Sequence, residues 1–181
     1  MSEQDEHDYG YGTETSVEPD YMDVDQAMRE VTGVYNITCP TVQAEWGSIP
    51  YMNTSQLRLF ICSDGSQTWG SYSWGPFTGT ILMDPGPRPG KTGVHFEWRN
   101  RERETGTVRL SGEVGGEIEF DIDAHDVQGA FFTLYGERME FWGHRRPGPL
   151  WAGKPADQFK RDWDDLLADS EGRGPYGRGW R

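Results

Sequence analysis

Five segments between residues 92 and 145 alternate apolar with polar residues. They are TGVHFEWRNRE, GTVRLSGEV, GEIEFDIDA, DVQGAFFTL and ERMEFWGHR, and each is followed by a turn that contains Gly, Asp or Asn. Because side chains along a β-strand point alternately to the two faces of a sheet, this period of two predicts strands with one buried face and one solvent-facing face. Strands this close in sequence pair through tight hairpins, so the stretch predicts an antiparallel meander.

The two faces of the predicted meander differ in chemistry. We expect the apolar rows to face the core, Val108 and Leu110 among them, as well as Val127, Gly129 and Phe131. The solvent face carries a carboxylate ladder, which we define as Glu117, Glu119, Asp121 and Asp123. We expect the ladder to pair across the sheet with arginines of neighbouring strands, namely Arg99, Arg101, Arg103 and Arg109.

Further strands are predicted upstream, at residues 32–39, 56–62, 67–75 and 76–84, with a short helical turn at 41–46 and a loop at 84–91. The chain therefore contains about nine short strands with almost no helix between them. A single antiparallel sheet of this size tends to close on itself, because closure removes its exposed edges. The pattern favours an all-β fold, an antiparallel up-and-down barrel of eight or nine strands, calycin-like as in lipocalins and avidins. A two-sheet sandwich is the alternative.

The chain divides into five regions by composition. Residues 1–31 hold ten acidic residues against Arg29 alone and show no sustained apolar period, which is typical of a disordered arm. The barrel is expected at residues 32–146, a linker at 147–154, an amphipathic helix at 155–170 and a flexible Gly/Arg tail at 171–181. The apolar stripe of the helix consists of Phe159, Trp163, Leu166 and Leu167. It either packs on the outside of the barrel, which we favour, or contacts another protein.

Charge and cysteine content narrow the partners and the compartment. Most of the net charge of −13 lies in the N-terminal arm, so the chain offers little attraction to a phosphate backbone and nucleic acid is disfavoured as a partner. The sequence shows neither a signal peptide nor an apolar run of membrane-spanning length. Cys39 and Cys62 are expected to be free thiols. Together these observations favour a cytoplasmic or nuclear protein without membrane attachment.

Three groups of residues suggest chemistry. His95, His125 and His144 lack the close spacing of a metal site, so we expect no metal. The carboxylate ladder lacks the loop of a calcium site and is expected to be a charged outer face. The aromatic residues are the most suggestive group, because aromatic side chains line many ligand sites. The candidate ligand-binding residues are Tyr35, Trp69, Tyr72, Trp74 and Trp98, although such rings equally fill the core of a small barrel.

Several segments resemble a group of uncharacterised fungal small β-barrel proteins. The shared patterns are G-x-Y-x-I-x-C-P, here Gly33 to Pro40; F-x-W-R-x-R-E, here Phe96 to Glu102; and a closing segment at 137–145. In that closing segment Gly136 lies one residue further from the rest than the group's pattern places it. The resemblance covers residues 32–146 and implies a fungal source and a small barrel. It implies no activity.

The sequence carries no nucleophile elbow, phosphate-binding loop, dinucleotide fingerprint, H-E-x-x-H or Cys–His cluster. We therefore predict no catalytic residue and no cofactor, and lean against an enzyme. The favoured function is a non-catalytic binding or protein-interaction module, whose partner is a protein or a hydrophobic small molecule. The alternative is a lipocalin-like carrier, or an isomerase- or cyclase-type enzyme, that acts on a hydrophobic small molecule. The composition does not indicate an oligomeric state.

Overall fold

The computed structural model describes residues 31–50, 52–88, 92–121 and 125–174 of the 181-residue chain. The predicted acidic arm at 1–31 lies outside these residues, except for the buried Val31, and so do residues 175–181 of the predicted tail. Asp123 of the carboxylate ladder is also outside them.

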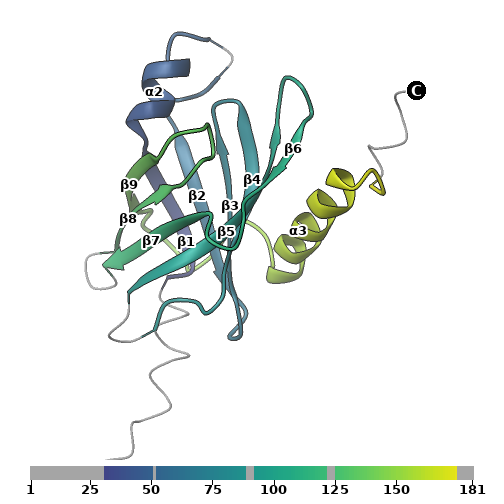
Figure 1. Cartoon of the computed structure of the whole chain (residues 1–181). Coiled ribbons are helices and arrows are strands. Elements are labelled where there is room, and N and C mark those ends of the chain that lie inside the picture. The colour runs from purple at the N-terminus through teal and green to yellow at the C-terminus, as the bar shows by residue number, and fades with distance from the viewer. Residues whose placement is uncertain (1–30, 51, 89–91, 122–124, 175–181) are drawn as a thin grey trace, which may run out of the picture.

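Nine strands and two helices make up the described chain (Figure 1). The strands are β1 (Gly33–Thr38), β2 (Leu57–Ser63), β3 (Thr68–Trp74), β4 (Phe77–Met83), β5 (Gly93–Glu102), β6 (Val108–Leu110), β7 (Gly116–Asp121), β8 (Asp126–Phe131) and β9 (Met139–Arg145). The helices are α2 (Pro40–Trp46) and α3 (Ala156–Ser170).

Eight of these strands form a closed antiparallel ring. The order β4-β3-β2-β1-β9-β8-β7-β5 is closed by pairing of β4 with β5, in which Phe77 lies opposite Glu102 and Leu82 opposite Glu97. The strands that begin and end the barrel also pair, with Tyr35 opposite Arg145. The predicted up-and-down barrel is therefore confirmed, and the two-sheet sandwich is wrong.

Strand β6 lies outside the ring and corrects one sequence-based assignment. It pairs with β5 on the edge that β7 also uses, with Arg99 opposite Leu110. Its side chains consequently have no barrel interior to face, and the prediction that Val108 and Leu110 point into the core is wrong. Val108 is only half-buried, and Leu110 is 40% exposed.

The sheet is interrupted between β6 and β7, and Trp98 forms hydrogen bonds to residues on both sides of the interruption. The Trp98 backbone N–H donates to the Ser111 hydroxyl at 2.8 Å, and its indole Nε1 donates to the Gly115 carbonyl at 3.0 Å. The short segment 112–114 consequently projects from the barrel wall, and its Val114 side chain is 49% exposed. This projection forms one border of the outer-face groove described below.

The two helices cover different parts of the barrel (Figure 1). Helix α2 starts at Pro40, where proline loses no helical hydrogen bond. Its last residue, Trp46, packs edge-on against Phe77 with ring centroids 5.6 Å apart. Helix α3 runs along the outside of the barrel beside β3, β4, β5 and β6. It buries the side chains of Phe159 and Trp163.

Candidate functional site

The interior of the barrel contains four of the five candidate ligand-binding residues. Tyr35, Tyr72, Trp74 and Trp98 are all 3% exposed or less. The rings of Tyr72 and Trp74 lie 5.4 Å apart, and both contact Phe131. Trp69 is not with them, because it points outward from the same strand and lies beneath α3.

Aromatic rings fill the interior around these residues. Phe131 packs against Phe96 and Phe141, at centroid distances of 5.0 and 5.7 Å. Several rings contact glycine backbone directly: a Cβ on Gly116 would lie 2.2 Å from Phe96, and one on Gly129 would lie 2.7 Å from Phe141. This close packing supports the core-filling interpretation of the aromatic residues and leaves little room for a ligand among them.

Burial shifts the pKa of both interior tyrosines. The Tyr35 hydroxyl donates to the Val31 carbonyl at 2.9 Å, and burial raises the pKa of Tyr35 to about 12 although Arg145 opposes the shift. Burial also raises the pKa of Tyr72, whose hydroxyl faces the side chain of Asn100. Both tyrosines therefore stay protonated at neutral pH, and neither is poised as a base.

The candidate interaction residues belong to the contact between α3 and the barrel. Phe159 and Trp163 pack with Trp69, Phe60 and Leu82 on the outer surface. The Arg99 guanidinium stacks on the Trp163 ring at 3.9 Å, and its Nη1 donates to the Trp163 carbonyl at 2.9 Å. Leu166 and Leu167 are half-buried. The stripe of the helix thus lies on its own barrel, as we favoured.

This contact also changes the role of the arginines that were expected to pair with the carboxylate ladder. Arg99 stacks on Trp163, and Arg101 forms an ion pair with Asp169 of α3. Arg103 donates to the hydroxyls of Ser73 and Thr78. The predicted pairing of these three arginines with the ladder is wrong, because α3 and strands β3 and β4 offer them nearer partners.

Glu117, Glu119 and Asp121 of the carboxylate ladder instead line a groove elsewhere on the outer surface. We define the outer-face groove as two adjoining hollows of about 980 and 550 Å³ over β5, β7, β8 and β9. The 84–88 loop and the projecting Glu113 and Val114 border the larger hollow. Its floor consists of outward side chains, among them Glu117, Glu119, Gln128, Arg138, Glu140 and Trp142.

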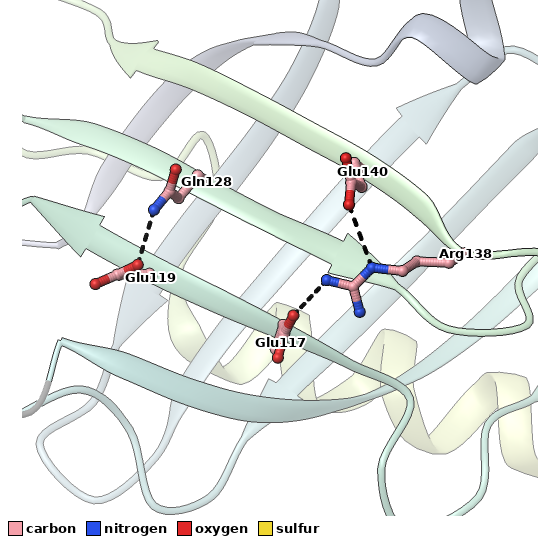
Figure 2. A network of polar contacts seen from close by, with 5 residues as sticks. All are labelled: Glu117, Glu119, Gln128, Arg138 and Glu140. Carbon is pink, nitrogen blue, oxygen red and sulfur yellow. Dashed lines mark hydrogen bonds and ion pairs between the residues drawn. The ribbon is translucent and has the colours of Figure 1, made fainter.

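Hydrogen bonds and ion pairs hold the polar side chains of the floor in place, as Figure 2 shows. Arg138 lies between two carboxylates, with its Nη2 2.5 Å from Glu117 and its Nε 3.4 Å from Glu140. Gln128 donates from Nε2 to Glu119 at 2.8 Å. These contacts connect side chains of β7 with β8 and with the residue before β9. The polar side chains of the floor therefore contact one another in the absence of a ligand.

Trp142 is the only exposed large aromatic residue among the described residues that line the groove, and it borders both hollows. It is 47% exposed, lies opposite Gln128 on β8 and stands between Glu140 and His144 on the outer face of β9. His144 in turn contacts Asp126 at 2.5 Å, and both line the smaller hollow. The indole ring therefore lies in the middle of a polar surface.

The five candidate ligand-binding residues include neither Trp142 nor its neighbours Gln128, Arg138 and Glu140. The sequence does contain a signal for this surface. Alternation along MEFWGHR places Trp142 on the solvent face together with Glu140 and His144. A tryptophan on the polar face of a strand is the uncommon feature that could have indicated this surface.

The described residues hold neither a side-chain cluster suited to a metal ion nor a membrane-spanning helix. No group of three or more His, Cys, Asp or Glu side chains there is arranged to hold a metal ion. None of the helices in those ranges has the length and apolar character needed to cross a membrane. Cys39 and Cys62 are both free thiols, as predicted.

Comparison with known proteins gives no assignment. No protein-family model matches the chain, and no curated protein matches it.

Proposed function

We propose that this protein is a non-catalytic binding module that recognises its partner through the outer-face groove. The observation that carries the proposal is the exposed Trp142 ring within a floor of pre-arranged polar side chains. Ligand sites are concave, and interface hot spots are enriched in tryptophan and arginine, both of which this groove presents. Side chains that already contact one another lose less entropy when a ligand binds than side chains that are free to rotate.

A lipocalin-like carrier, or an enzyme for a hydrophobic small molecule, has less support. Either function needs space within the barrel, and the rings of Tyr72, Trp74 and Phe131 occupy it. The two free cysteines support the cytoplasmic or nuclear location that the sequence predicts.

Photo-cross-linking in cells tests the groove as a binding surface. A benzophenone amino acid replaces His95, which is exposed and lines the larger hollow. We expect a covalent adduct at this position, and we expect Trp142→Ala in the same chain to remove it. The control probe replaces Lys160, an exposed residue of α3 outside the groove, and should give no such adduct.

A second control is Trp151→Ala, because Trp151 is 54% exposed but lines neither hollow. This variant should keep the adduct at position 95. Persistence of the adduct in Trp142→Ala, or its absence from the parent chain, would contradict the proposal.

A further inference from the structure

The ligand class of the groove follows from the chemistry of its floor. Trp142 offers a flat apolar ring at the surface, since 47% of the residue is exposed. Such a ring binds a ligand that has a flat face of C–H groups, because the electron-rich face of an aromatic ring attracts the partial positive charge of C–H hydrogens.

The side chains around the ring offer hydrogen bonds of both kinds. Glu119 and Glu140 present carboxylate acceptors, while Gln128 presents both a carbonyl oxygen and an amide donor. These groups are planar, and Gln128 contacts Glu119 while Arg138 contacts Glu140 (Figure 2). Trp142 lies opposite Gln128 on the neighbouring strand and two residues after Glu140. Hydroxyl groups fit this surface well, because each is a donor and an acceptor at once.

Other ligand classes fit less well. Seven carboxylates line the two hollows against Arg88 and Arg138, so the groove repels phosphate, sulfate and other anions. Attraction for a basic peptide is weakened at the centre of the floor, because the Arg138 guanidinium offsets charge on Glu117 and Glu140. A wholly apolar ligand would cover these exposed polar groups without offering them hydrogen bonds in place of those they make with water.

We propose that the outer-face groove binds a neutral carbohydrate chain. Trp142 stacks on the C–H face of one pyranose ring, and Glu119, Gln128 and Glu140 exchange hydrogen bonds with its hydroxyls. The larger hollow, at about 980 Å³, continues past Trp142 into the smaller one, which suits an oligosaccharide better than a single sugar. This inference rests on the proposed function and specifies its ligand.

The test uses the full-length protein and defined neutral hexasaccharides: maltohexaose, cellohexaose, mannohexaose and chitohexaose. Isothermal titration calorimetry should show binding of at least one with a Kd of about 1 mM or below. In ¹⁵N NMR spectra the indole N–H resonance of Trp142, assigned through Trp142→Phe, should shift on titration. Binding at another surface would move other resonances instead and would overturn the proposal.

Matched variants distinguish stacking from general damage to the fold. Trp142→Ala should weaken binding about tenfold or more, whereas Trp142→Phe should retain most of it, since the smaller ring still stacks. Gln128→Ala should weaken binding several-fold through loss of its hydrogen bonds. Trp151→Ala should bind as the parent does. Melting temperatures within a few degrees of the parent show that each variant is folded, because the changed side chains are exposed.

The outcomes separate this inference from the proposed function. If none of the hexasaccharides binds but the cross-link at position 95 still depends on Trp142, the carbohydrate inference fails and the binding module stands. If a lysine- or arginine-rich peptide binds the groove with Trp142 dependence, the inference is likewise overturned. Loss of both the cross-link and sugar binding would overturn both proposals.

Discussion

At the scale of single residues, the barrel core is built from contacts between aromatic rings and glycine backbone. Gly79, Gly116 and Gly129 lie on three different strands, and each faces a ring: that of Tyr72, Phe96 and Phe141 respectively. Absence of a Cβ at these positions provides the volume that the ring occupies. The rings therefore fill a narrow barrel without pushing its wall outward.

Gly116→Ala tests this arrangement. A Cβ there would lie 2.2 Å from the Phe96 ring and 2.4 Å from the Ala130 carbonyl oxygen, so the strand or the ring must move. We expect the free energy of unfolding to fall by about 1–3 kcal/mol. Thermal denaturation should show a melting temperature that is lower by about 2–4 °C for each kcal/mol lost.

The matched control is Gly93→Ala, also in a strand, where a Cβ would meet nothing within 4 Å. Its stability should remain within about 0.5 kcal/mol of the parent. Equal stability of the two variants would show that the interior has spare volume. The interior of the barrel would then again be a candidate ligand site.

At the scale of elements, much of the fold follows from the sequence because one buried face imposes a period of two. Strands β1 to β5 and β7 to β9 match the alternating segments closely, and the stripe of α3 predicts a helix that packs on a surface. The orientation of Leu110 does not follow, because β6 alternates like its neighbours but lies outside the ring. The alternating pattern of a strand does not reveal whether that strand belongs to the closed ring or lies outside it.

The candidate site was only partly predictable for a related reason. Alternation places Glu117 and Glu119 on the solvent face, and the hairpin order β7-β8-β9 brings Glu140 and Trp142 beside them. The borders of the groove could not be predicted in this way, because the 84–88 loop and Val114 belong to irregular segments. Their positions depend on tertiary packing, which a periodic pattern does not encode.

Helix α3 offers the prediction at this scale. Trp163→Ala removes a ring that packs 5.9 Å from Trp69 and stacks with Arg99. We expect a loss of about 3–5 kcal/mol in the free energy of unfolding, measured by urea denaturation, since Trp→Ala changes in packed sites typically cost that much. Asp165→Ala, at an exposed position of the same helix, should change stability little. If Trp163→Ala were equally mild, α3 would be only loosely attached.

At the scale of the whole molecule, ring closure distinguishes strands that pair on both edges from a strand that pairs on one edge. Each strand of the ring has a neighbour on both sides, whereas β6 pairs with β5 alone among the described strands. Amides of a strand with one neighbour can open without disturbing the ring, so they open more cheaply than amides within it.

Hydrogen–deuterium exchange checks this division. After correction for intrinsic rates, we expect peptides that cover β6 to exchange about tenfold or more faster than peptides that cover β8. Strand β8 is a suitable reference because it pairs along its whole length with β7 and β9. Similar protection of the two strands would indicate that β6 opens only when the whole barrel unfolds.

The pairing of β1 with β9 has a consequence for synthesis of the chain. Tyr35 leaves the ribosome 110 residues before Arg145, the residue that lies opposite it on β9. Until β9 emerges, β1 has an open edge that can pair with other nascent chains. Hairpins of the early strands can form during translation, but the ring itself is completed only when nearly the entire chain has been made.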